Sequence, residues 1–437
     1  MKLGILGTGM IVKDVLTMYH ELGVEKTYLF STKKSKSQAL ELMKKYHLDK
    51  VYTDYDELLQ SDVDTIYCAL PNHLHYEFSK KALENDKNVI IEKPITANSK
   101  ELEDLIETAN KKNLMIFEAM NLHYIPAFLS LKEDLKKLGD IKIVSFNYSQ
   151  YSSRYNAFKE GTILPAFDFH KAGGALMDLN VYNIHALIDL FGKPVYHKYM
   201  ANIERNIDTS GMMLFDFEHF KALCIGAKDC KAPLMNTIQG NLGAIVVKCP
   251  LSQMTEYEIC YNDGTSEVKS FEKKHRLIYE FKAFMKMMEE KDYKNAEVEF
   301  QDAVDKKKNL GEAYRGLGLC YWEQKKYEKA EKALEKALKN GTEETATLYN
   351  ILGICDLELD KPEKAVYYFE NGQELSGAGK ELLKEMAYNL VVAYEKAGDY
   401  QSAKEKLDSY LKANPDDKKA LKEQEFLNTQ ISEGDQQ

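Results

Sequence analysis

The sequence predicts an α/β Rossmann domain, then an α+β domain with a mainly antiparallel sheet, and then an all-α solenoid of repeats. Three observations support this prediction. Short apolar runs alternate with helical spacing in the first part, long strands in meander order follow a helix in the second, and an Ala-, Glu-, Lys- and Leu-rich repeat fills the last. We expect domains at 1–120, 121–290 and 291–437, with a helix over 277–291 that serves both the second and the third.

Composition narrows the possible partners. The chain has 437 residues and a formal net charge of −10, which disfavours binding to a nucleic-acid backbone. It has no apolar run long enough for a membrane span, and MKLGILGTGM leads directly into a strand without the features of a signal peptide. The seven cysteines are scattered with no CxxC pair, as is typical of reduced thiols. We therefore expect a cytoplasmic protein without membrane or nucleic-acid partners.

A glycine turn follows the first predicted strand. Lys2 to Leu6 is the strand, Gly7-Thr8-Gly9 the turn, and Met10 to Leu22 the helix. In this context the glycines let the backbone approach a dinucleotide pyrophosphate at the helix N-terminus. Val12 stands where glycine or alanine is usual and should push the helix slightly away from the sheet. The candidate cofactor contacts here are Gly7, Thr8, Gly9, Met10 and Ile11.

The second strand, Thr27 to Phe30, ends without an acidic residue. An NAD-preferring site usually has a carboxylate there for the ribose 2′-hydroxyl, whereas this chain has Ser31-Thr32-Lys33-Lys34. Hydroxyl and ammonium groups suit a 2′-phosphate, so the sequence favours NADP and leaves NAD possible. The alternative is that the lysines form only a solvated turn. Ser31, Thr32 and Lys33 are the candidate contacts.

Two further loops lie at the same carboxyl edge of the predicted parallel sheet. Strand Thr65 to Ala69 leads into Pro71, Asn72 and His75, which we expect to reach the cofactor. His73 and His75 also suggest a metal, but no third ligand has suitable spacing, so no metal is expected. Strand Val89 to Ile91 ends in Glu92, Lys93 and Pro94, and a lysine in this position is placed at a site. Glu92 and Lys93 complete the candidate cofactor contacts.

The second domain supplies the predicted substrate side. An irregular stretch over 151–172 follows the strand Ile141 to Gln150 and should cover the site, with Tyr151, Arg154 and Phe167 as candidate substrate contacts. The sequence does not separate this role from loop packing. A helix then runs from Gly173 to Leu190, and strands follow as far as Phe271.

Four motifs together resemble those of the Gfo/Idh/MocA oxidoreductases, the family of glucose–fructose oxidoreductase and inositol dehydrogenase. They are GILGTGMI near the start, ALPNHLH, EKP at Glu92-Lys93-Pro94, and GGALMDLNVYNIH from Gly173, and the match covers about residues 1–290. The resemblance implies a nicotinamide-dependent enzyme acting on sugars, cyclitols or diols. It also implies that the family's usual final segment is missing here.

The resemblance assigns Lys93 to the family's EKP lysine, near the nicotinamide and the reacting oxygen. Many members have Asp and, four residues on, His; here Asp178 is followed by Tyr182, as in relatives that resemble dihydrodiol dehydrogenases. An i, i+4 pair shares one helix face, and the helix N-terminus favours the charge of Asp178. We expect Lys93 to stabilise the oxygen, Tyr182 to act as acid or base, and Asp178 either to orient these groups or to accept a hydrogen bond from a substrate hydroxyl. His185 is the alternative acid or base.

The last third contains a repeat that resembles the tetratricopeptide repeat. The alanines at 296, 330, 365 and 403 recur in similar hexapeptides at spacings of 34, 35 and 38 residues, with Leu-Gly pairs upstream at Leu317 and Leu352. A first, partial repeat is expected from helices over 277–291 and 295–307. Such repeats usually bind proteins or peptides or mediate assembly, so a homo-oligomer is also possible.

Two functions fit these features. The favoured one is an NAD(P)-dependent dehydrogenase or reductase for a small polyhydroxylated substrate, with a repeat module for protein interaction. The alternative is a non-catalytic dinucleotide-binding scaffold or sensor, or a fusion of two unrelated domains. Lys93, Asp178 and Tyr182 together favour the enzyme. Val12, the absence of histidine at position 182 and the shortened end of the second domain favour the alternative.

Overall fold

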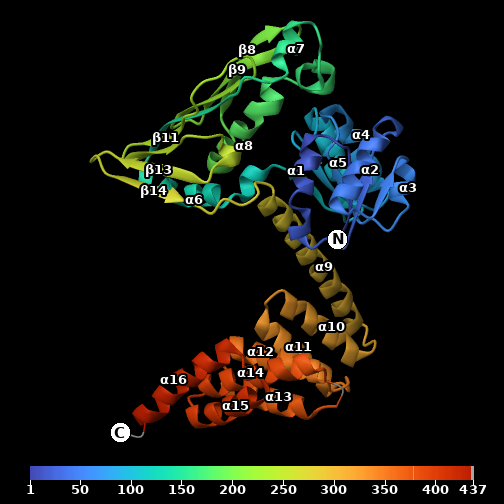
Figure 1. Cartoon of the computed structure of the whole chain (residues 1–437), viewed down its shortest axis with the longest axis vertical. Helices are drawn as coiled ribbons and strands as arrows, with labels where there is room; N and C mark the ends of the chain where they lie inside the picture. Colours follow the sequence, from blue (N-terminus) through green and yellow to red (C-terminus); the bar gives the residue numbers. More distant parts are fainter. Residues whose placement is uncertain (377, 435–437) are drawn as a thin grey trace. The chain divides into compact units, whose positions relative to one another are not determined.

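The computed structural model describes residues 1–376 and 378–434, which form two compact units, Met1–Lys286 and Met287–Gln437 (Figure 1). The first unit contains two β-sheets and the second contains only helices among its described residues. This is the predicted order of an α/β Rossmann fold, a mixed-sheet domain and a helical solenoid. The finer boundaries at residues 120 and 290 stay predictions.

The first sheet has the strand order β3-β2-β1-β4-β5-β6, and its neighbouring strands all pair in parallel. Its order reverses between β1 and β4, which is where ligands bind in open α/β sheets. Gly7 follows β1 with φ +109°, and a Cβ there would lie 3.0 Å from the carbonyl oxygen of Ala69 after β4, so only glycine suits this turn. The strands are β1 (Lys2–Leu6), β2 (Lys26–Phe30), β3 (Lys50–Tyr52), β4 (Thr65–Cys68), β5 (Asn88–Glu92) and β6 (Ile116–Ala119).

Helices connect these strands. They are α1 (Met10–Leu16), α2 (Lys36–Tyr46), α3 (Tyr55–Leu59), α4 (His75–Glu84) and α5 (Ser99–Lys111). The helix expected to reach Leu22 ends at Leu16, and a 3₁₀ turn (Tyr19–Leu22) closes on Gly23, whose left-handed φ of 65° ends the segment. Asp54 caps α3 by accepting from the backbone N–H groups of Asp56 and Glu57.

The second sheet has the order β14-β13-β12-β11-β7-β10-β9-β8. Only β7 and β10 pair in parallel; the other neighbours within this fully described unit are antiparallel, as predicted. The strands are β7 (Ile141–Ser149), β8 (Tyr196–Glu204), β9 (Ile207–Asp216), β10 (Lys221–Ala227), β11 (Asn236–Gly240), β12 (Gly243–Val247), β13 (Glu256–Tyr261) and β14 (Ser266–Ser270).

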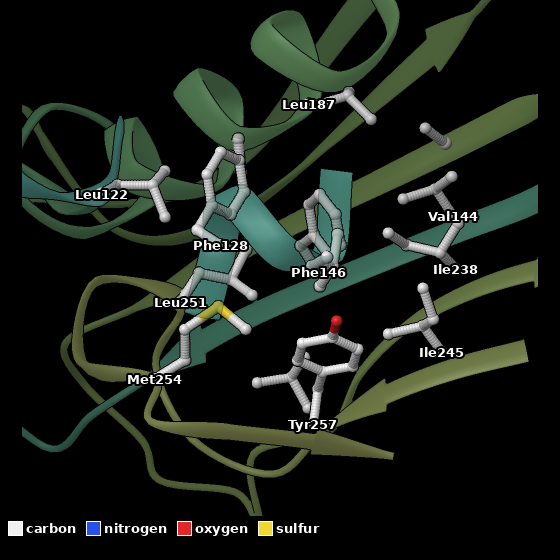
Figure 2. Packing of buried hydrophobic residues seen from close by; sticks show 14 of the residues in the cluster. Leu122, Phe128, Val144, Phe146, Leu187, Ile238, Ile245, Leu251, Met254 and Tyr257 are labelled. Atoms are coloured by element: carbon white, nitrogen blue, oxygen red, sulfur yellow. The ribbon is translucent and has the colours of Figure 1, made fainter. Parts of the chain in front are cut away.

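Two helices, α6 (Pro126–Asp134) and α8 (Val181–Phe191), pack on one face of the second sheet. Figure 2 shows Phe128 of α6 and Leu187 of α8 facing Phe146, with Tyr257 of β13 below them. The Tyr257 hydroxyl is satisfied in this core because it donates to Asp134 Oδ2 at 2.6 Å. This packing holds the N-terminal end of α8 in place.

The predicted helix from Gly173 is not regular. Residues Leu176–Asn180 form a π-helical turn, η8, and α8 begins only at Val181. Asn180 of this turn is fully buried and donates to the carbonyl oxygen of Cys224 on β10 at 3.1 Å. Asp178 therefore lies in a widened turn of the kind often found at functional sites, and not in the regular helix that the sequence predicts.

The start of α9 (Ile278–Asp305) packs against the first sheet. The Phe281 ring lies 5.2 Å from the Tyr67 ring of β4, and the Phe284 ring lies 4.7 Å from the Phe117 ring of β6. Both phenylalanines are fully buried. Residues that follow the second sheet in sequence therefore complete the core of the first.

The described helices of the second unit pair as expected for the repeats. The pairs are α10 (Leu310–Glu323) with α11 (Tyr327–Lys339), α12 (Ala346–Glu358) with α13 (Pro362–Glu374), and α14 (Lys380–Lys396) with α15 (Tyr400–Ala413), and α16 (Lys418–Gly434) follows. Gly353 allows close packing, because a Cβ there would lie 2.5 Å from the Phe369 ring. The predicted first partial repeat is wrong: α9 is one unbroken helix over 278–305, with no turn between 291 and 295.

The described residues contain neither a candidate membrane span nor a candidate metal site. No helix within 1–376 or 378–434 is long and apolar enough to cross a membrane. No group of three or more His, Cys, Asp or Glu in the same ranges is placed to hold a metal ion.

Candidate functional site

A cavity of about 1270 Å³ opens at the carboxyl edge of the first sheet, against the π-helical turn and loops of the second domain. Most of the sequence-predicted site residues line it. They are Gly7, Thr8, Gly9, Met10, Ile11, Ser31, Thr32, Pro71, Asn72, Glu92, Lys93, Arg154, Asp178 and Tyr182. The structure thus brings together residues from 7 to 182 on one concave surface.

One side of the cavity suits a dinucleotide. Gly9 precedes α1, and a Cβ there would meet no atom within 4 Å, so a ligand can approach the backbone closely at this position. Ser31 is 3% exposed, and its hydroxyl has no hydrogen-bond partner among the described residues. A buried polar atom without a partner is rare, and a ligand ribose or phosphate would satisfy it. Lys33 is exposed and does not line the cavity.

Lys93 is held at the centre of the cavity by Asp178. Its Nζ donates to Asp178 Oδ1 at 3.0 Å and to the Asp178 carbonyl oxygen at 2.8 Å. Burial disfavours the charged form, yet the neighbouring Tyr182 and Asp178 raise the pKa of Lys93 above its usual value. Lys93 is therefore a fixed ammonium group at neutral pH.

A second lysine, which sequence reasoning missed, binds the other oxygen of the same carboxylate. Lys228 directly follows β10 and is only 2% exposed. Its Nζ donates to Asp178 Oδ2 at 2.8 Å and to the carbonyl oxygen of Ala166 at 2.6 Å. Burial would raise the pKa of Asp178, but Lys93 and Lys228 hold it well below the usual range. The three side chains form an ion-paired triad in which Lys228 is buried and Lys93 and Asp178 are partly exposed to the cavity.

Tyr182 lies beside this triad. Lys93 Nζ is 4.9 Å from the centre of the Tyr182 ring, a cation–π contact, and the Tyr148 ring is 5.9 Å away. The Tyr182 hydroxyl has no hydrogen bond to any described residue, which leaves it open to a ligand in the cavity. Burial raises its pKa to about 12, although the charge of Lys93 opposes this, so the hydroxyl stays protonated at neutral pH.

Glu92 forms the floor beneath Lys93. It accepts hydrogen bonds from the Tyr67 hydroxyl and from the backbone N–H of Lys93. Burial raises the pKa of Glu92, and the fully buried Glu280 nearby has a raised pKa for the same reason. The two hydrogen bonds oppose the effect of burial on Glu92, and they hold the backbone at the Lys93 position.

His75 does not lie in the cavity. It is fully buried, with Nδ1 2.9 Å from the carbonyl oxygen of Pro94 and Nε2 2.8 Å from that of Leu70. Both ring nitrogens are occupied by backbone groups, so His75 joins the loop after β4 to the loop after β5. The expectation that it touches the cofactor is corrected to this bracing position.

His185 does not line the cavity either. Its Nδ1 lies 3.1 Å from His123 Nε2, and its Nε2 lies 3.5 Å from Glu118 Oε2. Burial and the neighbouring His123 lower its pKa to about 4, so it is neutral at neutral pH. Of the two acid or base candidates, only Tyr182 is open to the cavity.

Two of the three predicted substrate contacts lie elsewhere. Phe167 is 1% exposed and stacks on Phe158 at 4.8 Å in a small aromatic cluster. The Tyr151 hydroxyl donates to Asn156 Oδ1 at 2.7 Å, outside the cavity. Apolar residues in an irregular loop give no sequence pattern that separates packing from binding, and here packing prevails. Arg154 does line the cavity.

Further cavity residues had no signal in the sequence. Tyr148 lies on β7, and Arg276 comes from the segment after β14 and donates through Nε to Asp14 Oδ2 at 3.1 Å. The partners in this contact are 262 positions apart. Lys228 alone had a possible signal, because it follows the carboxyl end of a strand as Lys93 does.

The chain is similar in sequence and fold to known proteins. The Gfo/Idh/MocA model, described as an oxidoreductase family with an NAD-binding Rossmann fold, matches residues 1–120. A scyllo-inositol 2-dehydrogenase (NADP(+)) of Bacillus subtilis (strain 168) is 31% identical over 326 residues, covering 73% of this chain and 98% of that protein. The chain belongs to the Gfo/Idh/MocA oxidoreductase family. Because nearly the whole relative is matched, the expectation that the family's final segment is missing is not supported.

Other comparisons agree with the fold. A mouse trans-1,2-dihydrobenzene-1,2-diol dehydrogenase is 27% identical over 202 residues, covering 45% of this chain and 58% of that one. A levoglucosan dehydrogenase solved with NADH and levoglucosan has a TM-score of 0.60 at 18% identity, covering 67% of this chain and 90% of that one. A 3-ketoreductase from Actinomadura kijaniata solved with NADP and TDP-benzene has a TM-score of 0.57 at 19% identity, with the same coverage.

The second unit matches a different family. Tetratricopeptide repeat models match residues 309–372 and 385–417. The first match covers α10 to α13, and the second lies on α14 and α15. The repeats predicted from the spacing of the alanines at 330, 365 and 403 are confirmed.

Proposed function

We propose that this oxidoreductase transfers a hydride between NADP and a hydroxyl-bearing carbon of a sugar, cyclitol or diol. The observation that carries the proposal is Lys93, a buried ammonium fixed by Asp178 and set against Tyr182 in a cavity with an open glycine turn. The dehydrogenase and reductase names of the relatives support the reaction class. The NADP in the name of the Bacillus subtilis relative supports the cofactor.

The cofactor contacts follow from the cavity lining. Gly7 to Ile11 would hold the pyrophosphate, and Ser31 and Thr32 the adenosine ribose and its 2′-phosphate. Ser35 also lines this end, and its hydroxyl lies 3.1 Å from that of Thr32. The absence of a carboxylate at this end favours NADP, with NAD as the second choice. The bound nicotinamide would supply or accept the hydride.

Lys93 and Tyr182 would stabilise the charge that develops on the substrate oxygen and supply its proton. During carbonyl reduction, negative charge develops on the substrate oxygen, and the Lys93 ammonium stabilises it by electrostatic attraction. The Tyr182 hydroxyl, protonated at neutral pH, then donates its proton to this oxygen. Alcohol oxidation reverses the transfer. Asp178 fixes Lys93, and its ionised form keeps the lysine charged.

Replacing Lys93 with methionine tests the proposal. We expect kcat/KM to fall by about 10²-fold or more, on the scale of a lost electrostatic or acid–base group. NADPH affinity, measured by calorimetry, should change little. Lys112→Met is the matched control, because Lys112 pairs with Asp86 at 2.7 Å on the surface. Unchanged turnover in Lys93→Met would refute the role of Lys93, and NADPH binding without turnover by the wild type would favour a non-catalytic scaffold.

We further propose that the repeats bind a protein or peptide partner. The support is the family match together with a hollow of about 460 Å³ whose lining includes Phe300, Arg315 and Leu319. Leu319→Lys should abolish co-purification of the partner with the tagged full chain. Val298→Lys is the control, since Val298 is 68% exposed and does not line the hollow. Equal recovery with both variants would contradict this site.

A homo-oligomer is also proposed, with a second copy on the open face of the second sheet. Met200 and Met212 are cross-strand partners, and with Leu214 and Ile143 they are 42–51% exposed on β8, β9 and β7. A β-sheet face rich in methionine and aliphatic side chains is an unusual surface for a monomer. Light scattering of the full chain should give a multimer, and Met212→Lys should dissociate it. A monomeric wild type would contradict the proposal.

A further inference from the structure

The guanidinium of Arg154 has no hydrogen-bond or ion-pair partner among the residues that the structure describes. Arg154 lies on the loop after β7, just before α7 (Tyr155–Lys159), and lines the cavity. Its backbone N–H donates to Ser152 Oγ at 3.3 Å, whereas its side chain makes no hydrogen bond or ion pair with the described residues. By contrast, Arg205 near the same helix donates to the carbonyl oxygens of Phe158 and Lys159.

Cationic side chains outnumber carboxylates in the lining of this cavity. Lys93 and Lys228 both bind Asp178, so one carboxylate serves two ammonium groups. Arg154 is close enough to Lys228 to oppose its charge and so help lower its pKa, after the larger effect of burial. Arg154 and Asp178 line the same cavity, so the unpaired guanidinium shares this surface with a carboxylate that two other cations already bind.

The other carboxylates near the cavity do not offset this excess. Asp14 is engaged by Arg276, and Asp168 pairs with Lys171 at 3.2 Å. Glu92 accepts hydrogen bonds from the Tyr67 hydroxyl and the backbone N–H of Lys93, so both of its oxygens are engaged. Cations in a partly buried cavity are costly unless an anion meets them. The cofactor phosphates belong at Gly7 to Ile11 and Ser31, on the first sheet, whereas Arg154 comes from the second domain.

We propose that the substrate carries an anionic oxygen group, a carboxylate or a phosphate, and that Arg154 binds this group while the adjacent hydroxyl carbon reacts near Lys93. The inference rests on the proposed hydride transfer and narrows its substrate to sugar acids or phosphorylated sugars and polyols. Arginine suits this role because its planar fork of donors binds such groups through two parallel hydrogen bonds. A neutral sugar would leave that fork unsatisfied.

Binding to the NADP-loaded full chain tests the proposal without requiring turnover. Gluconate, glucose 6-phosphate and sorbitol would be titrated separately by calorimetry at low salt. We expect at least one of the two anions to bind at least tenfold more tightly than sorbitol, and which of them binds identifies carboxylate or phosphate as the group. Arg154→Met should remove that preference, and Arg154→Lys should restore part of it. Equal affinity for all three probes, or a preference that persists in Arg154→Met, would overturn the proposal.

Turnover gives a second readout. For the preferred anionic substrate, Arg154→Met should raise KM by about 10-fold or more with a smaller change in kcat, because Arg154 binds a group remote from the reacting carbon. Lys159→Met is the matched control: Lys159 is an exposed cation on the adjacent helix that does not line the cavity. Anion preference without turnover would contradict the proposed reaction alone. Turnover of neutral sugars as efficient as that of acids or phosphates would contradict the anionic substrate alone.

Discussion

Replacing Lys228 with methionine should destabilise the first unit and reduce activity together. Methionine fills similar space but leaves Asp178 Oδ2 and the Ala166 carbonyl oxygen without their donor. Removing one partner of a buried ion pair costs about 3–5 kcal/mol. Since Asp178 keeps Lys93 on its other oxygen, we expect the lower end, about 3 kcal/mol. For a unit of this size that corresponds to a fall in Tm of roughly 5–10 °C.

The assay is calorimetric unfolding of the full chain, with kcat/KM measured on the same preparations. Lys221→Met is the control on the same strand: Lys221 pairs with Asp216 at 2.9 Å with both side chains exposed, so its loss should cost at most about 1 kcal/mol. Turnover should fall at least tenfold in Lys228→Met, because Asp178 would no longer be fixed from both sides. A Tm within 2 °C of the control, or undiminished turnover, would refute the structural reasoning.

Three other predictions follow from the structure. Tyr182→Phe keeps the ring that Lys93 contacts at 4.9 Å but removes the proton donor, so kcat should fall by about 10²-fold with NADPH affinity unchanged; an undiminished kcat would exclude Tyr182 as the acid. Burial raises the pKa of Glu118 to about 7, so the folded state retains a proton that the unfolded chain releases from about pH 4.3 upward, and stability is lost as pH rises through this window. The free energy of unfolding would be measured in urea at pH 4.5 and pH 7.5 for the wild type and for Glu118→Gln. The variant should lose up to about 3 kcal/mol less stability between the two pH values. An identical pH dependence of the two proteins would contradict the prediction. Leu352→Ala, at a fully buried repeat position, should cost about 2–5 kcal/mol in urea unfolding, whereas Leu421→Ala, 42% exposed, should cost far less.

Local signals predicted the first sheet and the centre of the site well. Apolar runs ending in glycine, proline or charged residues mark the carboxyl ends of parallel strands, and these ends converge by topology. Lys93 and Asn72 could therefore be placed at one edge without knowledge of the fold's details. The Leu-Gly and Ala positions of the repeats are likewise local, because each reports contact with the neighbouring helix.

The failures have a common physical cause, which is that burial depends on distant partners. Nothing near His75 in sequence shows that Pro94 and Leu70 would occupy both its ring nitrogens. The sequence predicts that Phe167 contacts substrate, whereas its ring packs on Phe158, which is nine residues away in the chain. The repeat pattern implies a turn at residues 291–295, whereas α9 continues through them although Asp292, Tyr293 and Asn295 are weak helix formers.

The contact of Phe281 and Phe284 with the first sheet has a consequence for synthesis of the protein. When the ribosome has completed residue 120, Tyr67 and Phe117 still lack the rings that cover them. Roughly 160 further residues must be added, which at roughly 5–20 residues per second takes about 10–30 s. During that interval the nascent nucleotide-binding half exposes an aromatic surface. We expect it to depend on chaperones until the start of α9 leaves the ribosomal tunnel, even though its motifs all lie near the N-terminus.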